Sequence, residues 1–298
     1  MAGELRRVLW EHANLDLVTL VPTGGGESSS TFWATDRAGT VSVLKIVRGA
    51  PPGMVGELRA LDAVLGGLRD RGYPAPRFHA VGQVPGLVFW LQERLPGSAL
   101  DRGRGEPSRA AALLPGLLPE VFRLNDAQAG LGTGEREWRR LLTQTLTTGG
   151  DGYCLHSTLQ ARPDTRDLLR VVRRIGDRYA AAIPAGDDFV HYDFTLANVL
   201  SDGAAITGVI DINPPILAGD RAFDLATLLF YLYDHDVLRG LLRDRLLDLT
   251  GPQAARAYLA HMVLRQVDWS LRHHPTAAAT RHHLRLARLV TDDIGHTA

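Results

Sequence analysis

Short segments rich in apolar residues, separated by turn residues or a helical pattern, recur in the first part of the chain. Segments of this kind predict β-strands, and they are residues 17–21, 31–35, 40–47, 78–84 and 87–95. Between the third and the fourth of these segments, apolar residues recur at helical spacing over residues 53–71. The pattern therefore predicts five strands and one main helix in this region.

The pattern changes after Pro96 and Gly97. Long segments rich in Leu, Ala and Arg follow, and their apolar residues have helical spacing. An exception is residues 188–216, where apolar pairs and turn residues indicate loops and small strands. We predict an α+β protein with a hinge near residues 92–97, a smaller lobe over residues 1–94 and a larger, mainly helical lobe over residues 95–298.

The composition is that of a globular protein, with 45% hydrophobic and 22% charged residues among 298. The formal net charge is zero, so no sequence-wide attraction to nucleic acid or to an anionic membrane is expected, and any charged partner must be met locally. The single cysteine, Cys154, excludes an internal disulfide and fits a reducing compartment. The N-terminus lacks the apolar core of a signal peptide. We expect a cytoplasmic monomer.

Polar residues suited to phosphoryl transfer occur close together in residues 188–216. His191, Asp193 and Asn198 stand in HYDFTLAN with the spacing of a kinase catalytic loop, in which the Asp accepts a hydroxyl proton and the Asn holds a metal. Asp211 follows in VIDI as a second candidate ligand, since carboxylate and amide oxygens suit Mg²⁺. Asp and Asn also occupy turns and caps for backbone reasons. The joint pattern nevertheless favours a phosphotransferase site.

Lys45 is the only lysine among 33 basic residues, and it stands in the apolar segment VSVLKIV. In a strand its side chain shares a face with Val43 and Val47. Codon bias explains why the other basic residues are arginine, but a charged group on an apolar face is costly unless it is paired. The position therefore predicts a partner for the ammonium group.

The segments HYDFTLAN, VIDIN and GDRAFDLATLL, in this order, resemble the aminoglycoside phosphotransferase family of bacterial antibiotic kinases, over nearly the whole length of the chain. This resemblance implies a protein-kinase-like, two-lobed fold whose N-terminal sheet is antiparallel. It also implies ATP, with GTP as the alternative, and Mg²⁺ as cofactors. Tyr192 departs from the family pattern, where a small residue is usual between His and Asp, and Ile212 replaces the usual aromatic residue.

The resemblance also implies roles for particular residues. Asp193 would be the catalytic base and contact the acceptor, His191 would brace the loop, and Asn198 and Asp211 would hold magnesium. Lys45 would bind the nucleotide phosphates with Glu57 as its ion-pair partner, and Asp224 would be structural. The other nucleotide contacts implied are the glycine-rich loop with Gly25, Gly26, Ser28 and Ser29, and the hinge around Glu93 and Leu95.

A cationic acceptor would need carboxylates and an aromatic wall, because ammonium groups bind by charge pairing and cation–π contact. The candidates in the helical lobe are Asp151, Asp234, Asp236, Asp268 and Trp269. Of these we favour Asp268 and Trp269, which lie on a late helix.

We therefore expect an O-phosphotransferase that acts on a cationic antibiotic and confers resistance. The acceptor would be an aminoglycoside or a basic peptide of the viomycin and capreomycin type. Two alternatives remain open at this stage. One is a kinase of a small metabolite such as choline, homoserine or a sugar. The other is a non-catalytic pseudokinase that binds nucleotide or drug.

Overall fold

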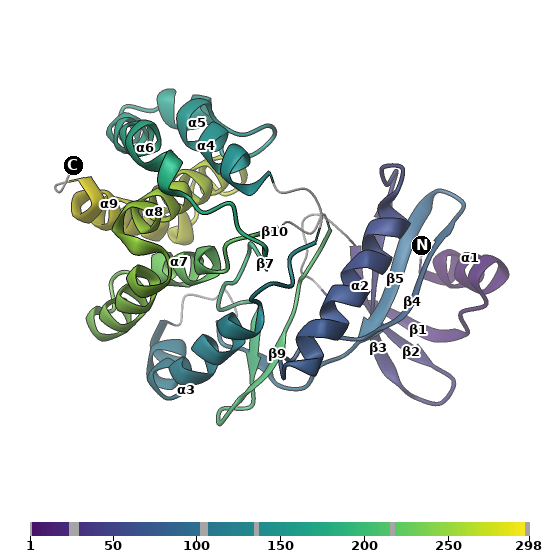
Figure 1. Ribbon diagram of the computed structural model, residues 1–298. Coiled ribbons are helices and arrows are strands. Elements are labelled where there is room, and N and C mark those ends of the chain that lie inside the picture. Colours follow the sequence, from purple (N-terminus) through teal and green to yellow (C-terminus); the bar gives the residue numbers. More distant parts are fainter. Residues whose placement is uncertain (1, 24–29, 102–106, 134–136, 215–217, 296–298) are drawn as a thin grey trace. The chain divides into compact units, whose positions relative to one another are not determined.

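The computed structural model describes residues 2–23, 30–101, 107–133, 137–214 and 218–295 (Figure 1). The chain forms two compact units. The N-terminal unit comprises Met1–Ser98, Leu200–Asp202 and Ile206–Ile216, and the C-terminal unit comprises Ala99–Val199, Gly203–Ala205 and Leu217–Ala298. The first unit is therefore discontinuous in sequence.

The N-terminal unit contains the predicted five-stranded antiparallel sheet, with strand order β1-β2-β3-β5-β4. Its strands are β1 (Leu17–Pro22), β2 (Ser30–Asp36), β3 (Val41–Arg48), β4 (Phe78–Val84) and β5 (Leu87–Glu93). The predicted main helix is α2 (Met54–Asp70), and a further helix, α1 (Ala2–Ala13), precedes the sheet. The α+β prediction is confirmed.

The helices α1 and α2 cover opposite faces of this sheet. Leu9 of α1 packs in one apolar cluster with Leu44 and Ile46 of β3, whereas Leu58 of α2 packs in another with Trp90 of β5. Side chains alternate between the faces of a strand, so Lys45 lies on the α2 face. Its Nζ is 5.7 Å from the centre of the Trp90 ring. Lys45 thus lies on the same face of the strand as Val43 and Val47, as the sequence predicts, and α2 covers this face.

The segment Ile206–Ile216 belongs to the N-terminal unit because it is hydrogen-bonded there. The backbone N–H of Val209 donates to the carbonyl of Pro74 (2.9 Å), and the Thr207 hydroxyl donates to the carbonyl of Pro96 (2.7 Å). The short strands β6 (Ser98–Ala99) and β8 (Val199–Ser201) carry the chain from one unit to the other, and β9 (Ile206–Val209) lies within the N-terminal unit. Asp211 is therefore held in the same unit as Lys45.

Helices dominate the C-terminal unit, as the sequence predicts. They are α3 (Pro107–Ala127), α4 (Trp138–Thr148), α5 (His156–Gln160), α6 (Arg166–Tyr179), a 3₁₀ turn (Ala180–Ala182), α7 (Ala222–Tyr231), α8 (Asp236–His273) and α9 (Ala278–Gly295); strands β7 (Asp188–Phe189) and β10 (Ala218–Gly219) pair with each other. Helix α7 packs on α8, which also packs on α6 and α9 (Figure 1). In the part of the chain described here, none of the helices has both the length and the apolar character that a bilayer span requires.

Helix α8 is interrupted at Gly251, where φ is 74° and ψ is 168°. Pro252 follows and cannot donate the backbone hydrogen bond of a continuous helix. The segment after this break carries Arg265, Asp268 and Trp269 along one uninterrupted run of turns.

Candidate active site

The catalytic loop predicted at His191–Asn198 follows β7 and contains a residue in a rare backbone conformation. Tyr192 has φ +71°, a backbone value that costs free energy for a bulky residue. The Tyr192 ring stacks on Phe223 (5.3 Å between centroids, 15° between planes) and meets Trp138 and Tyr153 edge to face. Aromatic packing thus holds Tyr192 in place.

Asp224 in the first turn of α7 fixes the backbone of this loop. Its carboxylate accepts the N–H groups of His191 and Tyr192, each at 2.9 Å, and the side-chain amide of Gln128 at 2.6 Å. Burial raises the pKa of Asp224, while His191, Gln128 and the two backbone N–H groups act in the opposite direction. The structural role expected for Asp224 is therefore visible as three hydrogen bonds.

The carboxylate of Asp193 is oriented through both of its oxygens. Oδ1 accepts a hydrogen bond from Arg265 Nη2 (2.9 Å), and Oδ2 accepts one from Asn198 Nδ2 (3.1 Å). The Asp193 side chain is still 44% exposed, so solvent or a ligand can reach it. The Asp193 N–H also donates to His191 Nδ1 (3.3 Å), so the His191 ring contacts the backbone of this residue.

Arg265 is a site residue that the sequence did not predict. It lies on α8 and donates to the Tyr192 carbonyl as well as to Asp193, and its guanidinium is 4.5 Å from the centre of the Tyr192 ring. Burial is the largest single effect and lowers its pKa, but Asp193 acts in the opposite direction together with Tyr192, Tyr231 and Cys154, and the net shift is upward. Arg265 is therefore a fixed positive charge beside the proposed base.

Lys45 has partners other than the one predicted. Its ammonium group donates to Asp211 Oδ1 (2.6 Å) and to Asn213 Oδ1 (3.1 Å), and its side chain is only 6% exposed. The predicted ion pair with Glu57 is not formed, because Glu57 lies on the exposed side of the first turn of α2. The partner of the lysine is thus the candidate metal ligand Asp211, whose φ is +63°.

Asn198 of the C-terminal unit and Asp211 of the N-terminal unit each offer an oxygen atom of the kind that the predicted divalent metal needs. The amide nitrogen of Asn198 is engaged by Asp193, with hydrogen bonds to its carbonyl (2.9 Å) and carboxylate, and this arrangement leaves the amide oxygen as the donor for a metal. Asp211 supplies a carboxylate that is 46% exposed. Amide and carboxylate oxygens are the ligands that Mg²⁺ prefers in proteins.

The remaining predicted nucleotide contacts are less informative. Gly25, Gly26, Ser28 and Ser29 lie outside the described residues. At the hinge, the Glu93 N–H already donates to the Arg77 carbonyl (2.8 Å), and Leu95 is half-buried beside Gly208.

Most of the acids predicted to bind a cationic acceptor have arginine partners. Asp268 is fully buried and accepts two hydrogen bonds of 2.9 Å from Arg272, one turn further along α8. Its charge is therefore balanced inside the unit, and it is withdrawn as an acceptor contact. Asp234 pairs with Arg285 and Asp236 with Arg239, both at 2.7 Å. Asp151 is exposed, and Trp269 is half-buried with its ring against His273 and His274.

Comparison with known families agrees with this arrangement. Residues 19–259 match the sequence model of the phosphotransferase enzyme family. The chain belongs to this family. The match spans the sheet, the catalytic loop and most of α8, and it confirms the prediction that the protein is a phosphotransferase. No curated protein sequence matches the chain.

Solved structures show that the phosphotransferase shares its fold with several kinases. An amicoumacin kinase, solved with AMP-PNP, Ca²⁺ and amicoumacin, superposes with a TM-score of 0.62 at 12% identity over 98% of this chain and 96% of that one. An aminoglycoside phosphotransferase from Streptomyces rimosus, solved with ADP and streptomycin, superposes with a TM-score of 0.56 at 16% identity, over 89% of this chain and 99% of that one. A putative fructosamine-3-kinase from Haemophilus somnus superposes with a TM-score of 0.57 at 13% identity, over 99% of this chain and 98% of that one. The predicted kinase-like fold is confirmed.

Proposed function

We propose that this phosphotransferase transfers the γ-phosphoryl group of ATP to a hydroxyl group of a cationic antibiotic and so confers resistance. The observation that carries the proposal is the half-exposed Asp193 carboxylate, which is oriented by Arg265 and Asn198 on a loop that Asp224 fixes. A carboxylate placed in this way can orient an acceptor hydroxyl and take its proton.

The metal and nucleotide functions follow from the oxygen donors and from Lys45. Asn198 and Asp211 would hold Mg²⁺, which neutralises charge on the phosphates when bound. The Lys45 ammonium, now hydrogen-bonded to Asp211, would contact the α and β phosphates. The glycine-rich loop at residues 22–30 would cover the phosphates, and backbone groups near Glu93 and Leu95 would meet the base. The amicoumacin kinase, which shares the fold, binds AMP-PNP and Ca²⁺, and this supports a nucleotide with a divalent metal.

The acceptor would bind beside α8. Trp269 lies one helical turn beyond Arg265, so its ring is on the same side of the helix as the group that orients the base. Asp151, exposed in the loop after α4, is the acid we retain for a cationic group. Two proteins with this fold are named for, or bound to, the antibiotics amicoumacin and streptomycin. Phosphorylation adds roughly two negative charges at neutral pH, which would weaken binding of such a drug to RNA.

A metabolite kinase is the second candidate function, because one protein with this fold is named a putative fructosamine-3-kinase. The balanced charges of Asp234, Asp236 and Asp268 also suit a less cationic acceptor. A pseudokinase is disfavoured, since Lys45, Asp193, Asn198 and Asp211 are all in place.

A panel of acceptors tests the proposal. Purified protein, Mg²⁺ and γ-labelled ATP are incubated separately with aminoglycosides, basic peptide antibiotics, choline, homoserine and sugar amines. We expect label in one antibiotic class, and the same class should define the resistance profile of a sensitive host that expresses the gene. If only a metabolite is labelled, that metabolite and not an antibiotic is the acceptor. No label in any acceptor would overturn the proposal.

Lys45→Arg is expected to lower kcat/KM for ATP by at least about tenfold, which corresponds to about 1.4 kcal/mol. The longer, forked guanidinium cannot occupy the space between Asp211 and Asn213 without moving them, and it presents its charge differently to phosphates. Steady-state kinetics with varied ATP measure this effect. Arg48→Lys, on the exposed end of the same strand, is the matched control and should behave as the wild type. Full activity of Lys45→Arg would contradict the nucleotide function of Lys45.

A further inference from the structure

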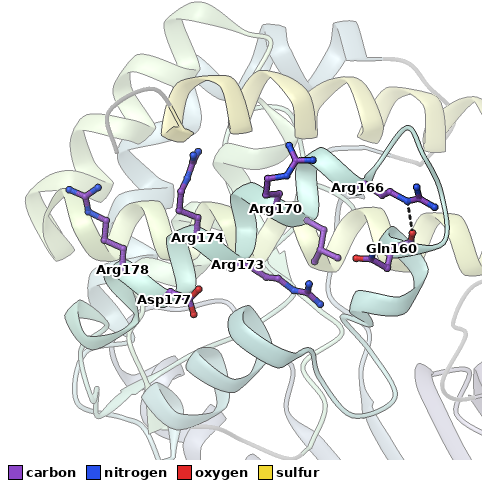
Figure 2. A pocket seen from close by; sticks show the side chains of 8 residues that line it. Gln160, Arg166, Arg170, Arg173, Arg174, Asp177 and Arg178 are labelled. Carbon is purple, nitrogen blue, oxygen red and sulfur yellow. Dashed lines mark hydrogen bonds between the residues drawn. The ribbon is translucent and has the colours of Figure 1, made fainter.

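A cavity of about 730 Å³ lies on the outer side of α6 in the C-terminal unit, and its walls are strongly basic. Arg166, Arg170, Arg173, Arg174 and Arg178 line it together with Gln160, Leu169 and a single acid, Asp177 (Figure 2). The volume is in the range of ligand-binding pockets. None of these residues belongs to the catalytic loop or to the nucleotide contacts.

The arginines form a regular row. Arg166, Arg170, Arg174 and Arg178 are spaced four residues apart, so they follow one side of the helix at steps of about 6 Å over about 18 Å. In Figure 2, Arg170 and Arg174 extend from the same side of α6, with Arg166 and Arg178 at the two ends. The positive charges are thus arranged along a line.

Few of these charges are balanced by the protein. Among the described residues, Arg170 is the one member of the cavity's arginines with an ion pair, to Asp167 at 2.7 Å. Arg166 donates to the Gln160 carbonyl (2.9 Å) and Arg173 to His156 Nδ1 (3.1 Å), and both acceptors are neutral groups. The positive charge of Arg173 also lowers the pKa of His156, after the larger effect of burial. Like charges four residues apart destabilise a helix, so the row favours an anionic ligand over a purely structural function.

The opposite side of α6 anchors the row. Leu168, Val172 and Ile175 are buried in the unit, so the helix cannot turn an apolar face toward a bilayer. None of the described residues that line the cavity is aromatic, so bases have nothing to stack on. The site can therefore recognise only the charge and spacing of its ligand.

We propose that this α6 groove binds the phosphodiester backbone of single-stranded nucleic acid, without preference for sequence. A chain with phosphates repeated along its length can engage the whole row, whereas a compact phosphate reaches only part of it. The zero net charge of the protein does not oppose such contact, because that value averages over the chain while the groove concentrates cations on one helix face.

Fluorescence anisotropy with labelled U12 and dT12 tests the proposal on the full-length protein. At 50 mM salt both oligonucleotides should bind with similar affinity, and log K should fall with log salt with a slope of about −3 for four phosphate contacts. Charge reversal of the central pair, Arg170→Glu with Arg174→Glu, should weaken binding at least tenfold and make the slope shallower. Phosphoryl transfer and the melting temperature should stay near the wild-type values.

The matched control is Arg48→Glu with Arg59→Glu, two exposed arginines of the N-terminal unit with the same change in net charge. It should weaken binding no more than about twofold by its effect on overall charge. An equal loss in both double variants would overturn the proposal, as would undetectable binding of U12 at 50 mM salt. If pyrophosphate displaces U12 at equal phosphate concentration, the ligand of the groove is a small polyphosphate and not a nucleic acid. If anionic vesicles bind more strongly than U12, the partner of the groove is an anionic membrane and not a nucleic acid.

Discussion

Asp193→Asn is expected to lower kcat for phosphoryl transfer by about 10²–10⁴-fold, the range that a general base contributes. The amide keeps the shape of the side chain and can still accept the hydrogen bond from Arg265, but it cannot take the proton of an acceptor hydroxyl. ATP affinity and the melting temperature should change little. Steady-state kinetics with the acceptor found in the panel, together with equilibrium binding of ATP, measure the two effects separately.

The control for this variant is Asp244→Asn, an exposed acid on α8 for which wild-type kinetics are expected. If Asp193→Asn keeps more than a tenth of the wild-type kcat, Asp193 is not the base.

Two variants of Arg265 test how the base is oriented. Arg265→Lys keeps the charge and should retain more kcat than Arg265→Met, with KM for ATP unchanged in both. Equal losses in the two variants would assign Arg265 a packing function only.

Asp224→Ala is expected to lower the free energy of unfolding by about 3 kcal/mol or more and to reduce kcat at least tenfold. Removal of the carboxylate leaves the N–H groups of His191 and Tyr192 and the Gln128 amide without their acceptor, and each buried, unsatisfied donor costs about 1–3 kcal/mol. The freed backbone would also let Tyr192 leave its unfavourable φ, which displaces Asp193. Denaturant unfolding and kinetics measure the two losses.

Asp236→Ala provides the comparison for Asp224→Ala, because it removes the same group from the first turn of another helix. Asp236 is exposed and pairs only with Arg239, so both stability and kcat should be close to the wild type. A stable and active Asp224→Ala variant would show that the catalytic loop keeps its conformation without this carboxylate.

Short-range patterns in the sequence predict the features of the site that depend on local geometry. The alternation in VSVLKIV places Lys45 on a buried face, and the HYDFTLAN spacing brings Asp193 and Asn198 into hydrogen-bonding distance across one loop turn. Asp224 in the first turn of α7 could be interpreted as structural for the same reason. Each of these inferences needs only the periodicity of a strand, a helix or a loop.

Pairing between distant residues could not be predicted in this way. Asp193 and Arg265 are 72 residues apart, and nothing in the local sequence distinguishes Arg265 from the many other arginines. Lys45 and Asp211 are separated by 166 residues, and a helix-start carboxylate such as Glu57 looked the more natural partner. The Asp268 side chain, in contrast, has its arginine four residues on, so the i, i+4 rule could have identified that pair.

The discontinuity of the N-terminal unit limits how the gene can be divided. A fragment that ends at residue 98 would contain Lys45 but lack Asp211 and Asn213, and it would also lose the strand hydrogen-bonded to Pro74 and Pro96. The complementary fragment would carry that strand, paired with β8, but without the carbonyl groups of Pro74 and Pro96 that accept its hydrogen bonds. Split reporters, domain swaps and chimaeras of this enzyme therefore need residues 200–216 to accompany the first unit, by fusion or by co-expression, whichever boundary is chosen near the hinge.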